Sequence, residues 1–235
     1  MRSRLGYLLA LFVAGSALAL GFVSEQWVMA AIALGVALAL ALGVFIESGP
    51  DSAKEVVLIA TLTGIAVAGR LLVHPFPGVQ PMTVIVVASG AAFGLRIGVS
   101  VGALGALVSN FFLIQGPWTP WQMALWALCG AVGALAARLA RRRLVFALLC
   151  AVLAFGFSSA MDVAYWWYAY AHTWAGLSWQ VTSGFTFTLA HALGSFAIAL
   201  AVGPELVRML ERFGRRLHTE IVWEEEPLPE EPARV

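Results

Sequence analysis

The sequence has 235 residues, of which 61% are hydrophobic and 11% are charged, and its formal net charge is +1. Soluble domains are about 45–50% apolar and about 25% charged, so a chain of this composition cannot cover its apolar side chains with one water-soluble surface. We therefore expect a lipid bilayer around the chain and no nucleic acid among its partners.

Charge-poor apolar stretches recur along the chain, and several reach about 18 residues or more, the length that spans a hydrocarbon core. They predict helices at 6–23, 27–46, 55–73, 82–95, 97–114, 120–140, 144–170 and 184–213. These runs lack the period-two alternation of a barrel strand. The expected fold class is all-α, with about eight transmembrane helices, of which 82–95 is short enough to be tilted, bent or only partly crossing.

The chain divides into three predicted regions. Residues 1–50 predict an accessory transmembrane hairpin and linker, because a second apolar run follows the first too closely for a cleaved leader. Residues 51–217 predict a six-helix membrane domain. Residues 218–235, rich in glutamate and proline, predict an acidic disordered tail.

Basic residues mark alternate connections between the predicted helices. Positively charged loops stay on the cytoplasmic side, which predicts a multi-pass protein of the plasma membrane with both termini in the cytoplasm. With that orientation Arg70 lies near the outer face, and the other basic residues of the helices and their connections lie inside: Arg2, Arg4, Lys54, Arg96, Arg138, Arg141, Arg142, Arg143, Arg208, Arg212, Arg215 and Arg216.

The three outward connections, 74–81, 115–122 and 172–184, contain most of the unusual residue types. Proline stiffens the first two, which lowers the entropy lost when a loop closes on a ligand. Tryptophan and proline also mark helix ends at a lipid interface, so this second interpretation stays open. The candidate ligand-binding residues in these connections are His74, Gln80, Gln115, Trp118, Trp121 and Gln122.

Asp162 is the only acid in the outer half of a predicted helix, and Arg70 lies at a similar depth as its expected counter-ion. Charged groups in lipid are costly, so the pair either locks two helices or faces a ligand. Trp166 and its aromatic neighbours offer flat surface beside the acid, which suits a ring-bearing ligand. We expect one outward pocket bordered by Arg70, Asn110, Gln122, Asp162 and His191.

Small residues recur at a spacing of four in two predicted helices, and this spacing lets another helix approach closely. They are Ala60, Gly64 and Ala68 in the first case and Gly98, Gly102 and Ala106 in the second. No P-loop motif is present, so energy for transport would come from a partner. Cys129 and Cys150 have no metal-site spacing, and we expect no metal or cofactor.

Residues 55–215 have distinctive features in combination: six helices that begin near Glu55, a Pro-rich connection after the first, and the segments Ser109-Asn110-Phe111-Phe112 and Gln115-Gly116-Pro117-Trp118-Thr119-Pro120-Trp121-Gln122-Met123. Together they resemble the substrate-binding S components of energy-coupling factor (ECF) transporters, especially the branch predicted to handle cobalamin-like compounds.

The resemblance implies a six-helix bundle, here preceded by the two-helix hairpin, that binds a vitamin or a vitamin precursor from outside. It also implies docking on a transmembrane scaffold subunit that carries two ATPases, through small residues of the first core helix. Ala60, Gly64 and Ala68 match that pattern. Such a subunit is not itself an enzyme.

Two other functions stay open. An intramembrane hydrolase would use His172, His191, Asp162 and a serine, although no His-Glu-x-x-His motif is present. An assembly protein without a small ligand would have a compact interior and no outward cavity.

Overall fold

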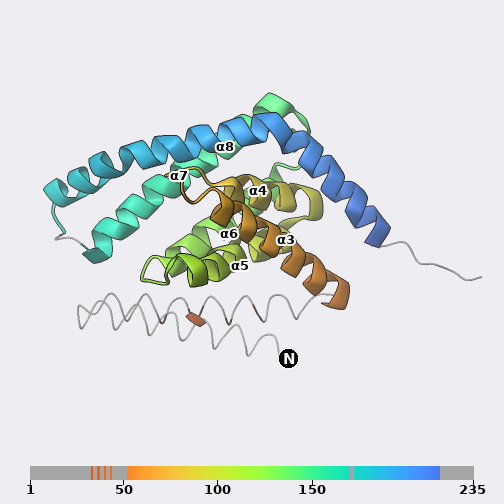
Figure 1. Ribbon diagram of the computed structural model, residues 1–235, viewed down its shortest axis with the longest axis horizontal. Helices are drawn as coiled ribbons and strands as arrows, with labels where there is room; N and C mark the ends of the chain where they lie inside the picture. Colours follow the sequence, from red (N-terminus) through yellow and green to blue (C-terminus); the bar gives the residue numbers. More distant parts are fainter. Residues whose placement is uncertain are drawn as a thin grey trace, which may run out of the picture.

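A computed structural model of the protein describes residues 52–169 and 172–217, together with residues 33, 36, 37, 40 and 43. Within the two continuous ranges the chain is helical and contains no strand (Figure 1). The elements are α3 (Ser52–Leu72), α4 (Pro81–Phe93), α5 (Leu95–Leu113), α6 (Thr119–Leu135), the 3-10 helix η1 (Leu139–Arg141), α7 (Arg143–Ala169) and α8 (Trp174–Leu217). The six expected helices of the membrane domain are therefore confirmed, whereas the expected first hairpin and the acidic tail lie outside the described residues.

The expected start of the last helix at residue 184 is wrong, because α8 begins at Trp174. Thr173 caps this start: its side-chain oxygen accepts from the backbone N–H of Gly176 at 3.1 Å, and its carbonyl accepts from that of Leu177 at 3.1 Å. The small polar residues between 178 and 184 resemble a loop in composition, but they lie on a helix that packs along α7.

Helix α4 lies at the centre of the bundle and contacts each of the other described α-helices. Its 13 residues span about 20 Å, less than the roughly 30 Å of a hydrocarbon core. Nine of them are buried, so protein rather than lipid surrounds most of the helix. A helix shorter than the hydrocarbon core is tolerated at membrane depth when protein surrounds it.

Glycines allow α4, α5 and α6 to approach backbone to backbone. A Cβ atom on Gly98 would lie 2.7 Å from Gly90 Cα and 2.6 Å from the carbonyl oxygen of Gly130, so any larger residue would separate the three helices. The small-residue stripe of α5 is thus internal packing. The stripe of α3 differs, because a Cβ on Gly64 would meet nothing within 4 Å.

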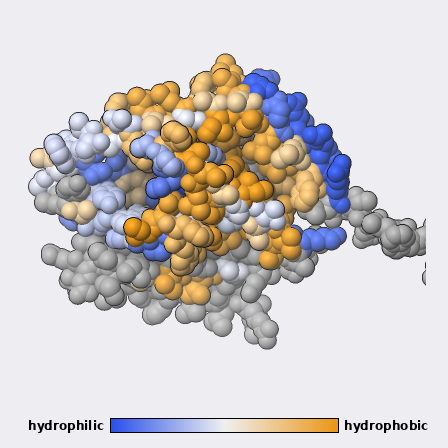
Figure 2. All heavy atoms as spheres, in the orientation of Figure 1, coloured by the Kyte–Doolittle hydropathy of each residue, from blue (hydrophilic) through white to orange (hydrophobic). Residues whose placement is uncertain are grey.

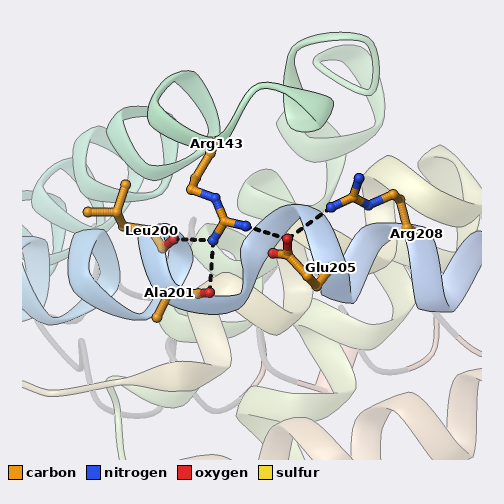
Figure 3. A network of polar contacts seen from close by, with 5 residues as sticks. All are labelled: Arg143, Leu200, Ala201, Glu205 and Arg208. Carbon is orange, nitrogen blue, oxygen red and sulfur yellow. Dashed lines mark hydrogen bonds and ion pairs between the residues drawn. The ribbon is translucent and has the colours of Figure 1, made fainter.

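Helix α8 has 44 residues and a length of about 66 Å, twice the thickness of a hydrocarbon core. It changes direction along its course, and Pro204 lies inside it (Figure 1). Proline has no N–H to donate to the carbonyl four residues earlier, that of Leu200. Arg143 of α7 replaces this donor, at 2.7 Å from the Leu200 oxygen and 2.9 Å from that of Ala201 (Figure 3).

Four of the described helices, α3, α5, α7 and α8, are long and apolar enough to cross a bilayer. Hydrophobic side chains cover the middle of the molecule, and hydrophilic ones gather towards its two ends (Figure 2). The chain is therefore a helical membrane protein. The expected count of eight crossings is not confirmed, because α4 and α6 are shorter than the other four and the two helices expected before residue 50 fall almost entirely outside the described residues.

Candidate functional site

The connections 73–80 and 114–118 lie at one end of the bundle, called here the loop end. Gly78 seats the first connection on α8: its φ is 83°, and a Cβ there would lie 2.7 Å from the Cβ of Ala190 and 2.9 Å from the Phe187 carbonyl. Only glycine combines this left-handed backbone with so close an approach. The connection is therefore held directly against the helix that follows it by about 100 residues.

A cavity of about 540 Å³ opens beneath this connection. Connection 73–80, α3, α5, α6, α7, α8 and the residue before α6 all contribute to its wall. The lining residues are Arg70, His74, Phe76, Pro77, Gly78, Val79, Gln80, Asn110, Leu113, Trp118, Gln122, Met161, Tyr165 and Phe187. Small-molecule sites commonly have volumes of about 300–1,000 Å³, so this cavity suits a ligand of drug-like size.

The floor of the cavity is a hydrogen-bond network around Arg70. Its guanidinium donates to Asn110 Oδ1 at 2.9 Å and to the hydroxyl of Ser109. The amide nitrogen of Asn110 in turn donates to Thr119 at 3.0 Å and to Gln122 at 2.8 Å. Three helices therefore share one buried amide, which fixes the position of the cation.

The same guanidinium lies over the ring of Trp126, 4.7 Å from its centroid. Such a cation–π contact gains strength when water is excluded. Arg70 forms no ion pair within the described ranges, and no acidic residue lines the cavity. The floor therefore presents a positive charge that neutral groups hold in place.

Aromatic side chains form one wall of the cavity. The rings of Trp118 and Tyr165 lie nearly parallel, with centroids 6.3 Å apart and an angle of 13° between their planes. Phe76 and Phe187 add to the apolar lining. Gln80 also lines the cavity, and its buried side-chain oxygen has no hydrogen-bond partner among the described residues. A buried acceptor left unpaired inside a cavity is a position where a ligand can donate.

A second polar chain lies behind the cavity and joins α4, α6, α7 and α8. Trp126 Nε1 donates to Thr83 Oγ1 at 3.1 Å, and that hydroxyl lies 2.8 Å from His191 Nε2. The other ring nitrogen of His191 lies 2.8 Å from Ser158 Oγ. His191 is fully buried and does not line the cavity, so its position is that of a satisfied core residue.

Asp162 and Arg70 do not form the expected ion pair. The Asp162 carboxylate accepts from Gln180 Nε2 at 2.9 Å and from Thr188 at 3.5 Å, both on α8. Gly184, which lies between them on the same helix, leaves room for the carboxylate, since a Cβ there would overlap it. Asp162 therefore holds α7 against α8. The expected role in locking two helices is present, but the partners are Gln180 and Thr188 instead of Arg70.

Six of the predicted site residues line the cavity: Arg70, His74, Gln80, Asn110, Trp118 and Gln122. The other five do not: Gln115 donates to the Leu107 carbonyl, Trp121 faces outward, Trp166 donates to the Thr173 carbonyl, and Asp162 and His191 are buried between helices. The prediction that Asp162 and His191 border the pocket is therefore wrong.

Three helical residues line the cavity without having been predicted from the sequence: Leu113, Met161 and Phe187. All are apolar residues within apolar helices, so neither type nor spacing distinguishes them from lipid-facing or core positions. Phe187 lies one helical turn before His191, and the expected helix 184–213 already placed it near the outer end, but a phenylalanine there is equally typical of a lipid-facing position.

The family comparison matches residues 50–211 to a family described as a family of unknown function (DUF6580). This match covers more than half of the chain, which therefore belongs to that family, and it includes every residue that lines the cavity. No curated protein and no solved structure matches the chain.

Replacement of Thr83 by valine tests the chain behind the cavity. Thr83→Val keeps the shape of the side chain but leaves Trp126 Nε1 and His191 Nε2 without their buried partner, so we expect a loss of about 1–3 kcal/mol in the free energy of unfolding. Thr63→Val is the matched control, because the buried Thr63 hydroxyl has no partner among the described residues and its loss costs no hydrogen bond there. Unfolding of the purified protein in detergent measures the free-energy change of both variants. An equal loss in the two variants would contradict the hydrogen-bond chain that runs from Trp126 through Thr83 to His191.

Proposed function

We propose that this member of the DUF6580 family is the substrate-capturing membrane subunit of an ECF-type importer. It takes a vitamin or a vitamin precursor into the loop-end cavity and delivers it together with a scaffold subunit and two ATPases. The observation that carries the proposal is the cavity itself, which has a fixed cation in its floor and a stiff connection as its cover. With the positive-inside orientation, this cavity opens to the outside of the plasma membrane.

The chemistry of the lining favours a ring-bearing ligand with an acidic group. Trp118 and Tyr165 offer flat aromatic surface, on which a planar ring stacks. Arg70 offers an uncompensated guanidinium, which pairs with a carboxylate or a phosphate through charge-assisted hydrogen bonds. His74, Gln80 and Gln122 supply donors and acceptors around these two anchors. The sequence resemblance favours a cobalamin-like compound, whereas a cavity of about 540 Å³ would enclose only a part of so large a ligand or the whole of a smaller ring-bearing vitamin, so both classes are tested.

The small-residue stripe of α3 supports the proposed docking on a scaffold. This stripe is exposed at all three of its residues, Ala60, Gly64 and Ala68. The similar stripe of α5 is buried against α6 instead. Small residues let another helix approach the backbone closely. An exposed stripe next to lipid therefore suits a partner helix.

An intramembrane hydrolase is a second candidate, favoured by one observation: Ser158 Oγ lies within hydrogen-bond distance of His191 Nδ1, as a nucleophile lies beside its base. Three features count against it. Both residues are buried, neither lines the cavity, and Asp162 bonds to Gln180 rather than to His191.

Labelling by a fluorophosphonate probe separates the two candidates. An importer subunit is expected to show no covalent labelling, because a buried serine outside the cavity is not accessible to the probe. Labelling that is lost in Ser158→Ala would instead establish the hydrolase. The His191→Gln variant serves as a second check, since a true nucleophile depends on its base.

Trp118 and Trp121 form a matched pair for the binding test. Mass spectrometry of small molecules that co-purify with the protein identifies the ligand, and titration then measures its affinity. We expect Trp118→Ala to weaken binding about tenfold, because a stacking face is lost. Trp121→Ala is the control, since this side chain is 37% exposed and does not line the cavity. Equal losses in both, or failure of a wide panel of vitamins to bind, would contradict the proposal.

Gly64→Leu tests the docking surface on α3. We expect this variant to bind the ligand normally but to lose ligand uptake in cells that co-express ECF scaffold and ATPase subunits. Gly156→Leu is the matched control, because Gly156 lies exposed on α7 and a Cβ atom there would also meet nothing within 4 Å. Normal uptake with Gly64→Leu would exclude the stripe as the docking surface.

A further inference from the structure

A second cavity, of about 720 Å³, lies at the opposite end of the bundle from the loop end. Its lining is entirely charged: Arg141 of η1 and, from α8, Glu205, Arg208, Glu211, Arg212 and Arg215. Positive charges outnumber negative ones by two. Neither the loop-end cavity nor the α3 stripe includes any of these residues, so the proposed import function leaves this site without a role.

Ion pairs hold the arginines of this second cavity in place. Glu205 accepts from Arg208 at 2.9 Å and also from Arg143, which at the same time donates to the Leu200 carbonyl freed by Pro204 and to the Ala201 carbonyl (Figure 3). Glu211 accepts from Arg141 at 3.3 Å and so joins η1 to α8. Two glutamates thus position several guanidinium groups without neutralising them all.

Arg212 differs from its neighbours, because it has no hydrogen bond or ion pair with any residue that the structure describes. It lines the cavity between Arg208 and Arg215, one helical turn from each. An arginine that lines a built cavity and lacks a partner there leaves its planar set of donors available for an anion.

This end of α8 lies at a membrane boundary. About 66 Å of helix is roughly twice the hydrocarbon thickness, and the acidic and arginine residues of α8 are confined to residues 205–216. Met209 and Phe213 are exposed on the same segment, each next in sequence to a cavity arginine. A helix with arginines on one face and exposed apolar residues on another is typical of a segment that lies in the lipid interface.

We propose that the second cavity binds the phosphate headgroup of an anionic phospholipid. The phosphate accepts hydrogen bonds from Arg212, Arg208 and Arg141, and the acyl chains lie against Met209 and Phe213. Guanidinium groups bind phosphate through paired, charge-assisted hydrogen bonds. The exposed apolar neighbours favour a lipid over a free phosphate, which would gain nothing from them.

Titration of the full chain in neutral detergent, followed by native mass spectrometry, tests this site. We expect saturable binding of phosphatidylglycerol and weaker binding of phosphatidylcholine with the same acyl chains. Arg212→Gln is expected to weaken phosphatidylglycerol binding about fivefold, the effect typical of one basic residue at an anionic surface. Arg138→Gln is the matched control, because Arg138 is exposed near the same end but does not line the cavity.

Four results would overturn the assignment. Equal affinity for the two lipids would exclude headgroup recognition, and equal loss in Arg138→Gln and Arg212→Gln would indicate a diffuse field rather than a site. Inorganic phosphate binding as tightly as phosphatidylglycerol would exclude the lipid as the source of the anion. Stronger lipid binding after removal of residues 218–235 would identify the acidic tail as the occupant instead. The unfolding temperature without lipid checks that each variant is folded.

Discussion

The placement of Arg70 is the constraint on which the loop end depends. A guanidinium within a membrane bundle is costly unless its donors are satisfied, and here Ser109, Asn110 and the ring of Trp126 satisfy it with no acid. Neutral partners leave the charge in place for a ligand, whereas an ion pair with Asp162 would have cancelled it. Because Asp162 bonds to α8 instead, the cavity keeps a net positive floor that can select an anion.

Rigid packing below the cavity complements this polar floor. The glycines of α4, α5 and α6 bring three helices into backbone contact, so the centre of the bundle has no room to rearrange. The chain from Trp126 through Thr83 to His191 then ties this centre to α7 and α8. A cation held from below by a stiff core keeps its position when the cavity is empty, which lowers the cost of binding.

The six helices of the membrane domain could be predicted from hydropathy, because strongly apolar, charge-poor runs separated by polar connections have few alternatives in a membrane. The start of α8 could not, since Ser178, Gln180 and Ser183 have the composition of a loop and only the contact with α7 makes them helical. Residue type identified Arg70, Asn110 and Gln122 as site residues. It failed for His191 and Asp162, because the direction of a polar side chain within a bundle depends on helix rotation, which a single sequence does not fix. Met161 and Phe187 gave no signal at all.

Helix α3 connects the two parts of the proposed import function. Arg70 in the cavity floor lies two residues after Ala68 of the exposed stripe, so the ligand and the scaffold would contact the same helical turn. Among the described helices α3 packs mainly against α5 and α4, and its far end is tied to α5 by the ion pair between Glu55 and Arg96. The end near the cavity is tied to α5 as well, because Arg70 itself donates to Ser109 and Asn110. A ligand that accepts from Arg70 would therefore act on this contact between α3 and α5, so binding and docking can be coupled through α3 without any rearrangement of the close-packed centre formed by α4, α5 and α6.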